Sequence, residues 1–221
     1  MNSTKQLFTI GHSNLTIEDF LSLLDQNKIT ALADVRSHPY SRYLPHFNKL
    51  TLQEALEKTG IRYVFLGQEL GARPTDLSCY VNGKARYELI AATPLFSQGI
   101  QRILKGTETY QIAIMCAEKD PITCHRTIMV CRELRKFNLE INHILNDGSC
   151  ESHQDLEKRL LKLHGLKQPQ LAQPKQLSLF DPIIPVNPVG DNRTLEERLA
   201  EAYHRQGEQI AYQITNHEKT D

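Results

Sequence analysis

YQIAIMCAEKDPITCHRTIMVCRELRKF, residues 110–137, joins an apolar run, a polar turn and a helix-like pattern. Residues 112–116 are apolar without interruption, which predicts a strand buried on both faces of a parallel sheet. Residues 118–123 contain a proline and predict a turn, and the apolar residues of 128–137 fall near helical spacing. The stretch therefore predicts a central strand that leads through a turn into a helix.

Six residues with reactive side chains lie within eleven positions of this stretch. They are Cys116, Glu118, Asp120, Cys124, His125 and Arg126. We expect the last three at the start of the helix, where unpaired N–H groups and the positive dipole end attract phosphate or carboxylate. Ligands also bind at this edge of an open parallel sheet. The alternative is that both cysteines pack in the core and the charges are solvated.

Strand and helix patterns alternate outward from this stretch. Further strands are expected at residues 7–13, 30–35, 61–66 and 140–145. Helices are expected after Thr16, around Leu52, across residues 89–104 despite Pro94, and across 154–163. This order predicts an α/β fold, a doubly wound and mostly parallel five-stranded sheet with helices on both faces.

The chain divides into three parts by composition. Residues 1–165 are the expected α/β domain, residues 166–192 a flexible linker rich in Pro and Gln, and residues 193–215 an amphipathic helix that Gly207 interrupts. This last helix docks either on the body or on a partner. We expect Glu197 and Glu201 on its solvated face, paired with nearby arginines.

Composition bounds the class of protein. A hydrophobic content of 40% in 221 residues is enough for a core, and no apolar run reaches the length of a membrane span, so no membrane partner is expected. Five cysteines without a disulfide framework favour the reducing cytoplasm. The 26 basic and 26 acidic residues cancel, so net charge argues neither for nor against nucleic acid.

Residues that follow three different strands are expected to share one cleft, because the carboxyl ends of parallel strands lie at one edge. The candidate catalytic residues are Asp34 or Glu118 as general base, His12 or His125 for proton transfer, and Cys124 as nucleophile or metal ligand. The candidate phosphate contacts from the same strand ends are Ser13, Arg36, Ser37 and Arg126.

The loop over residues 34–49 interleaves basic and aromatic side chains, with Tyr40 and Arg42 as candidate nucleic-acid contacts. Basic groups hold phosphates and aromatic rings stack on bases, which suits single-stranded or flipped nucleotides. The alternative is a surface loop that packs its aromatic rings on the body. A second irregular segment, residues 67–86, is a candidate lid over the same edge.

The sequence contains residue types that bind metals but not the spacing typical of a metal site. Cys116, Cys124 and His125 suit zinc or iron, yet the sequence has no paired C-x-x-C or H-x-x-x-H pattern, so we expect no metal and identify no cofactor. A catalytic thiol at Cys124 is the competing interpretation, because a helix start flanked by His125 and Arg126 lowers a thiol pKa. Cys79 and Cys131 are expected to be packing residues.

Four segments together resemble one known family. They are TIGHS at residues 9–13, DVRS at 34–37, LGQELG at 66–71 and CAEKDPITCHR at 116–126. In this combination the chain resembles the domain-of-unknown-function 488 family over about residues 7–147. The resemblance implies a compact α/β domain without a settled activity, and it supports treating the four segments as one site.

The pentapeptide QLSLF, residues 176–180, stands among prolines and glutamines. It resembles the motif by which bacterial replication and repair proteins bind the DNA sliding clamp. In that resemblance Gln176 hydrogen-bonds at one subsite, and Leu179 and Phe180, with Leu177 beside them, supply the apolar anchors. The alternative is that Leu179 and Phe180 pack on the body.

These observations lead to one expected function and two alternatives. We expect an enzyme of DNA repair or replication that acts on a nucleotide or on a nucleic-acid phosphate or base and is recruited by the sliding clamp. Its expected partners are the clamp and DNA or a nucleotide. The alternatives are a non-catalytic nucleotide sensor or adaptor, and a small-molecule enzyme that depends on a thiol.

Overall fold

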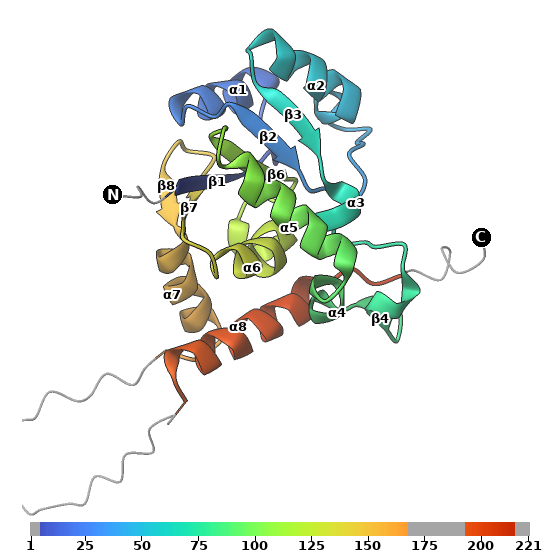
Figure 1. The fold of residues 1–221 in the computed structure, drawn as a ribbon, viewed down its shortest axis with the longest axis vertical. Helices are drawn as coiled ribbons and strands as arrows, with labels where there is room; N and C mark the ends of the chain where they lie inside the picture. The colour runs from blue at the N-terminus through green and yellow to red at the C-terminus, as the bar shows by residue number, and fades with distance from the viewer. Residues whose placement is uncertain (1–4, 168–192, 215–221) are drawn as a thin grey trace, which may run out of the picture.

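The computed structural model describes residues 5–167 and 193–214, built around a six-stranded sheet in the order β3-β2-β6-β1-β7-β8 (Figure 1). The predicted α/β class is confirmed, and the five predicted strands lie side by side in parallel. The sequence pattern missed the sixth strand, β8, which pairs antiparallel with β7 at one edge. The strands are β1 (Lys5–Gly11), β2 (Ala31–Asp34), β3 (Arg62–Phe65), β6 (Ile112–Cys116), β7 (Leu139–Ile144) and β8 (Cys150–Ser152), with a separate hairpin of β4 (Tyr80–Val81) and β5 (Lys84–Ala85).

Strand β6 shows why its sequence is apolar at every position. It pairs with β1 on one side and β2 on the other, and all five of its residues are buried. Ile112, Ile114 and Cys116 belong to one core cluster, whereas Ala113 and Met115 belong to the second. Since side chains alternate across a sheet, a strand covered on both faces needs apolar residues throughout.

Helices cover both faces of the sheet, as predicted for a doubly wound fold (Figure 1). Helices α1 and α2 pack Phe20, Leu24 and Leu52 into one core, and the later helices form the other. None of the helices in residues 5–167 and 193–214 is long and apolar enough to cross a membrane. The helices are α1 (Ile17–Gln26), α2 (Lys49–Lys58), α3 (Gly67–Leu70), α4 (Tyr87–Ala91), α5 (Pro94–Gly106), α6 (Arg132–Leu134), α7 (His153–Leu163) and α8 (Leu195–Ile210), with 3-10 turns at Pro45–Phe47, Leu77–Cys79 and Pro121–Thr123 and a π-helix at Arg126–Cys131.

The single helix predicted across residues 89–104 is wrong. Helix α4 ends at Ala91, and α5 begins at Pro94. The Thr93 hydroxyl accepts the Phe96 backbone N–H at 3.1 Å and so caps α5. Proline lacks a donor N–H and has a fixed φ, so it fits the first position of a helix better than the interior.

The helix predicted after Cys124 has a more complex form. A 3-10 turn at Pro121–Thr123 precedes it, the Arg126–Cys131 segment is a π-helix, and a single α-helical turn, α6, follows. All six residues of the π-helix are buried. A π-helical turn is rare and is frequently found at functional sites.

Helix α8 packs on the body, which decides between the two docking alternatives. Leu199, Ala202 and Tyr203 are buried in the larger core. The predicted interruption at Gly207 is wrong, because α8 continues through it to Ile210. A Cβ atom at Gly207 would lie 3.3 Å from the Tyr87 ring, so glycine here permits close packing of α8.

The chain after α8 joins the small hairpin. The Ala85 N–H donates to the Tyr212 carbonyl at 2.8 Å, and the Ile214 N–H donates to the Gly83 carbonyl at 2.8 Å. An isolated bridge also pairs Lys84 with Gln213. These bonds bring Tyr212 beside segments that are more than a hundred residues earlier in the sequence.

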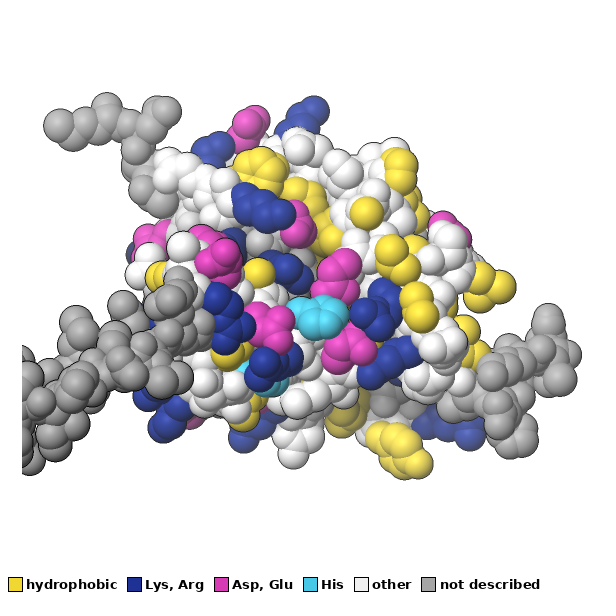
Figure 2. Space-filling model, turned by 90° about the horizontal axis from the view of Figure 1, so that it is seen from below, with side chains coloured by type: hydrophobic (Ala, Val, Ile, Leu, Met, Phe, Trp, Pro, Cys, Tyr) yellow, Lys and Arg dark blue, Asp and Glu magenta, His cyan; other side chains and the backbone are white. Residues whose placement is uncertain are grey.

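The outer side of α8 carries mixed charge. Figure 2 shows Lys and Arg side chains interleaved with Asp and Glu on the face seen from below. Arg205 pairs with Glu201 at 2.6 Å, and His204 pairs with Glu88 at 2.9 Å. The predicted pairing of Glu201 with an arginine on the solvated face is confirmed. Glu197 is exposed, as predicted, and forms a capping box with Thr194.

Candidate functional site

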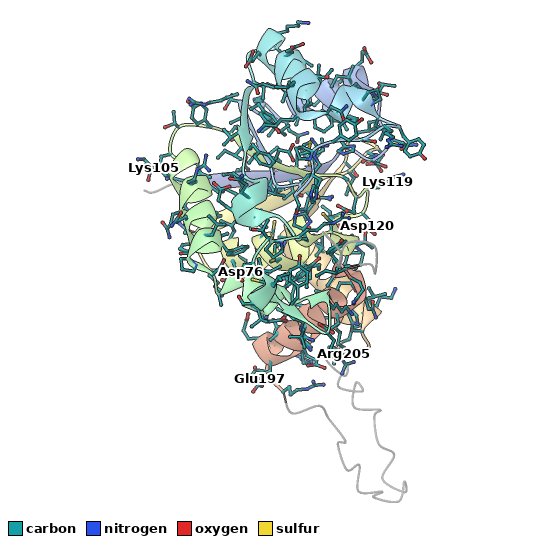
Figure 3. The ribbon with its side chains drawn as sticks, turned by 90° about the vertical axis from the view of Figure 1, so that its right-hand side faces the viewer. Asp76, Lys105, Lys119, Asp120, Glu197 and Arg205 are labelled. Atoms are coloured by element: carbon teal, nitrogen blue, oxygen red, sulfur yellow. The ribbon has the colours of Figure 1, made fainter. Side chains whose placement is uncertain are left out.

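The carboxyl ends of the parallel strands lie at one edge of the sheet, as predicted. Gly11 at the end of β1 pairs with Cys116 at the end of β6, so the loops after these strands leave the sheet together. Lys119 follows β6 and lies on one side of the molecule, and Lys105, in the helix that precedes β6, lies on the opposite side (Figure 3). The strand ends predicted to converge therefore meet on the Lys119 side.

Arg126 holds the loop after β6 in place. Its Nη1 donates to the Glu118 carbonyl at 2.8 Å and its Nη2 to the Lys119 carbonyl at 3.4 Å. The residue is fully buried, and the pocket described below does not include it. Arg126 is predicted from the sequence to contact phosphate. Its guanidinium is instead buried and positions Glu118 through the Glu118 and Lys119 carbonyl groups.

Asp34 forms a buried ion pair with Arg36. The Asp34 carboxylate, fully buried, accepts Arg36 Nε at 2.9 Å, Arg36 Nη2 at 2.7 Å and the Tyr63 hydroxyl at 2.8 Å. Burial, reinforced by the charge of Asp34, raises the pKa of Tyr63 far above its ordinary value, so Tyr63 remains a donor. The carboxylate predicted as a general base therefore orients Arg36.

His12 supports the same arginine. Burial and the nearby charge of Arg36 lower the pKa of His12 to about 4, so the ring is neutral at neutral pH. Because Nδ1 faces the Ser13 carbonyl at 3.0 Å, it carries the hydrogen, and Nε2 accepts Arg36 Nη1 at 3.3 Å. The ring also stacks on Phe47 at 4.3 Å. Both nitrogens are thus engaged, and neither His12 nor Ser13 lines the pocket.

Four reactive side chains meet beyond the end of β6, and we call Cys116, Glu118, Cys124 and His125 the thiol cluster. Their ligand atoms all lie within 4.8 Å of one another. Cys124 Sγ donates to Glu118 Oε2 at 2.9 Å, and His125 Nδ1 lies 3.6 Å from Cys116 Sγ. Cys116, Cys124 and His125 are buried, whereas Glu118 reaches the surface.

The two thiols of the cluster have opposite acidity. Burial and the hydrogen bond with Cys124 raise the pKa of Cys116 well above its ordinary value. Burial also opposes ionisation of Cys124, but the hydrogen bond from Cys116 and the charges of Arg126 and His125 lower the pKa of Cys124 well below its ordinary value. Burial, followed by the proximity of Cys124, raises the pKa of Glu118. Of these two thiols, Cys124 is therefore the one that loses its proton at the lower pH.

A cavity of about 470 Å³ opens directly over the thiol cluster. Among the predicted site residues, Arg36, Ser37, Tyr40, Glu118 and His125 line it. The remaining lining residues come from the same segments and from others along the chain. They are His38, Ala72, Arg73, Tyr87, Cys116, Ala117, Thr123, Ile210 and Tyr212.

Some predicted residues stand outside the cavity. Cys124 lies behind Glu118, and Arg42 is exposed on the neighbouring loop without lining the cavity. Gln176, Leu177, Leu179 and Phe180 lie outside the residues that the structure describes.

Sequence reasoning missed Arg73 and Tyr212 as site residues. The Arg73 guanidinium lies 4.2 Å from the centre of the Tyr212 ring, and the Arg73 N–H donates to Ser37 Oγ at 3.0 Å. Arg73 belongs to the segment predicted as a lid, so its region was indicated. No pattern indicates Tyr212, because its place depends on the docking of α8 and on the pairing that follows it.

A larger cavity of about 860 Å³ lies beside the same loop, bounded by Asp120, Asp147, Cys150 and Arg159 among others. Arg159 donates both Nη atoms to the Asp120 carboxylate at 2.8 Å. In this larger cavity the charges of Arg159 and Asp120 are therefore paired with each other. Neither Cys116 nor Cys124 lines it. We assign the chemistry to the smaller cavity.

One comparison with known proteins finds a match. The model of a family described as "Domain of unknown function DUF488" matches residues 16–132. Three of the four segments that carry the resemblance, at residues 34–37, 66–71 and 116–126, fall within this range. No curated protein and no solved structure matches the chain.

Proposed function

This chain belongs to the DUF488 family, and we propose that its pocket takes up one nucleotide of DNA on which the thiol cluster acts. A single observation carries the proposal. The cavity of about 470 Å³ is lined at once by guanidinium groups, by aromatic rings and by members of the thiol cluster. Phosphate recognition, base stacking and reactive groups are the three components that such an enzyme needs.

Arginine charge supplies the phosphate recognition. Arg36 lines the cavity and adds positive charge to its wall, but its Nε and Nη2 donate to Asp34 and its Nη1 to His12. Arg73 is exposed at the rim of the cavity and is the arginine placed to contact a phosphate directly. Arg73 has no carboxylate partner among residues 5–167 and 193–214, so its charge is available for an anion. A guanidinium binds phosphate with two parallel hydrogen bonds, which gives orientation as well as affinity.

Exposed tyrosines supply the stacking surface. Tyr40 lines the cavity and is 69% exposed, and Tyr43 on the same loop is 94% exposed. The alternative that this loop packs its rings on the body holds for Phe47, which is buried, and not for the tyrosines. Aromatic side chains stack on bases of any sequence, which suits recognition of an unpaired nucleotide.

The size of the cavity limits the substrate. A volume of about 470 Å³ is typical of small-molecule sites and cannot admit a double helix. The substrate is therefore a single-stranded, terminal or flipped nucleotide, whose base is already out of the stack.

The pentapeptide at residues 176–180 supports recruitment by the sliding clamp through its sequence. Phosphate contacts supply much of the affinity of most DNA-binding proteins, and a chain with zero net charge has no overall electrostatic attraction to DNA. Tethering to a clamp on DNA raises the effective concentration of DNA at the pocket and offsets this weakness.

Binding of labelled oligonucleotides tests the pocket. We expect single-stranded DNA, or a duplex with one unpaired base, to bind more tightly than a perfect duplex, and Arg73→Ala to weaken that binding about tenfold. Arg62→Ala is the matched control. The Arg62 guanidinium also lies against a tyrosine ring, 5.7 Å from the centre of Tyr110, but Arg62 is at the amino end of β3, away from the cavity. Equal losses in the two variants, or binding of none of the DNAs, would overturn the assignment.

Titration of purified clamp tests the recruitment. The intact chain should bind saturably, and the Leu179→Ala, Phe180→Ala double variant should not, because the two anchors are lost. The Ile183→Ala, Ile184→Ala double variant removes a neighbouring apolar pair and should bind like the intact chain. Undiminished binding by the first variant would show that another segment contacts the clamp.

A further inference from the structure

The thiol cluster has the donor set and spacing of a metal site. Two sulfurs, one imidazole nitrogen and one carboxylate oxygen lie within 4.8 Å of one another. In tetrahedral zinc sites the ligand atoms are about 3.3–3.8 Å apart, given bonds of about 2.0–2.3 Å. Cys124 Sγ and Glu118 Oε2 are 2.9 Å apart, and Cys116 Sγ and His125 Nδ1 are 3.6 Å apart. Small side-chain movements therefore bring all four atoms around one centre.

Atoms around the cluster already orient these ligands. His125 Nε2 faces the Val35 carbonyl at 3.0 Å, so Nε2 carries the hydrogen and leaves the Nδ1 lone pair to the cluster. A metal-binding histidine typically donates its other N–H to a carbonyl or carboxylate in this way. The Arg126 backbone N–H donates to Cys124 Sγ at 3.4 Å, a contact that stabilises a thiolate.

Charge balance favours a divalent cation. Two thiolates and one carboxylate carry three negative charges, and a divalent ion reduces this to one. The guanidinium of Arg126, fully buried next to the cluster, offsets the remaining charge. Buried charges are tolerated when they are paired or bind a metal.

We propose that Cys116, Glu118, Cys124 and His125 bind one zinc ion. Thiolate and imidazole ligands select zinc over magnesium and calcium, which prefer oxygen ligands alone. Because Cys116, Glu118 and His125 line the cavity, the ion faces it and places a Lewis acid at its floor. The inference goes beyond the proposed function, since the ion binds whether or not DNA enters the pocket.

Sequence spacing could not show this site. Cys116 and Cys124 are eight positions apart, and Glu118 is not a ligand in any C-x-x-C pattern. The loop held by Arg126 folds back and brings the four donors together. The proposal departs from the sequence-based expectation of no metal, and it adds Glu118 to the ligand types Cys116, Cys124 and His125 that the sequence offered.

Metal content and cobalt substitution of the reduced full-length chain test the proposal. We expect one zinc ion per chain by elemental analysis, and on cobalt replacement the intense visible bands of a tetrahedral site with a thiolate-to-cobalt charge-transfer band. Cys116→Ser and Cys124→Ser should each weaken cobalt binding at least tenfold. Cys150→Ser is the matched control, because Cys150 is an exposed thiol outside the cluster, and it should leave the spectrum unchanged.

Thiol alkylation of the unmutated chain gives a readout that does not depend on how the variants fold. In urea below the unfolding transition, where buried thiols are transiently exposed, zinc should protect Cys116 and Cys124 from alkylation and leave the reactivity of Cys150 unchanged. Less than a tenth of an ion per chain in reduced protein, absence of tetrahedral cobalt bands, or equal alkylation with and without zinc would overturn the metal site. Failure of Arg73→Ala to affect DNA binding would instead count against the proposed function alone.

Discussion

Gly11 and Glu118 approach each other so closely that a Cβ atom on Gly11 would overlap the carbonyl oxygen of Glu118. Gly11 is the last residue of β1, and Glu118 follows the end of β6. The same Glu118 carbonyl oxygen accepts a hydrogen bond from Arg126 Nη1 at 2.8 Å. The close approach lets the loop after β6 lie across the end of β1. The position of Glu118 in the thiol cluster therefore depends on the absence of a side chain at residue 11.

Gly11→Ala should displace this loop and disturb the thiol cluster. We expect the free energy of unfolding to fall by about 1–3 kcal/mol, as for other overpacked positions, and cobalt binding by the cluster to weaken as well. Urea unfolding and cobalt titration measure the two effects. Gly106→Ala is the control, since its added Cβ would meet only the end of the Ile112 side chain, at 2.8 Å. Normal cobalt binding by Gly11→Ala would show that the loop position does not matter.

Asp34→Asn should destabilise the fold because it leaves the charge of Arg36 buried without its partner. Removing one member of a buried ion pair typically costs about 3–5 kcal/mol. Asp155→Asn breaks the pair with Lys158, in which the Asp155 and Lys158 side chains are 61% and 75% exposed, and should leave the free energy of unfolding nearly unchanged. Urea unfolding at neutral pH compares the two variants. Similar small losses in both would mean that Arg36 finds another partner.

Tyr203→Phe should weaken the docking of α8. The Tyr203 hydroxyl lies 2.9 Å from Glu157 Oε1 and 3.0 Å from His153 Nε2, both buried. Its removal takes away the hydrogen-bond partner of His153 Nε2 and one partner of Glu157, which keeps its ion pair with Arg135 Nε at 2.7 Å. Loss of a buried hydrogen-bond partner typically costs about 1–3 kcal/mol. Tyr43→Phe removes the hydroxyl of a 94% exposed ring and should leave the unfolding free energy unchanged. Hydrogen exchange should show faster opening of α8 only in Tyr203→Phe.

The histidine pair beneath α8 should make the fold sensitive to acid. Burial lowers the pKa of His153 to about 4, with a further contribution from Arg135, and burial and His153 lower the pKa of His143 well below its ordinary value. Below about pH 6.5 the unfolded chain takes up protons that the native rings do not, so stability falls as the pH falls toward 4. For His153 alone the loss is on the order of 2 kcal/mol at pH 5.

Urea unfolding at pH 7 and pH 5 measures this loss, and His153→Gln should reduce it. Gln retains a donor and an acceptor for His143 and Tyr203 but does not titrate. A pH dependence that is the same with and without His153 would place the acid sensitivity elsewhere, for example at His12, whose pKa burial and the charge of Arg36 lower to about 4.

Local patterns predicted the parallel core correctly, because each buried strand must be apolar at every position and each surface helix must repeat its apolar face. The patterns missed β8 because Cys150–Ser152 is a three-residue edge strand without apolar alternation. They also joined α4 and α5, because apolar spacing continues past Pro94 while the backbone hydrogen bonds do not.

Candidate site residues were predicted best where they follow a strand of the parallel sheet. Arg36 follows β2 and Glu118 follows β6, and both line the cavity. His12 and Asp34 also follow strands, but they face Arg36 and not the cavity, and position along the sequence does not show which way a buried side chain points.

The sequence by itself determined the α/β class, the positions of the five parallel strands along the chain and the presence of reactive residues after β6, because these follow from local periodicity and from the geometry of parallel strands. Only the tertiary structure decided that Glu118 joins Cys116, Cys124 and His125, and that Arg73 meets Tyr212. Both arrangements depend on contacts between segments that are apart in the sequence. Buried Arg126 holds the loop after β6, and helix α8 packs on the body and brings Tyr212 to Arg73. Such contacts arise from packing and charge compensation across the whole molecule, and no short stretch of sequence encodes them.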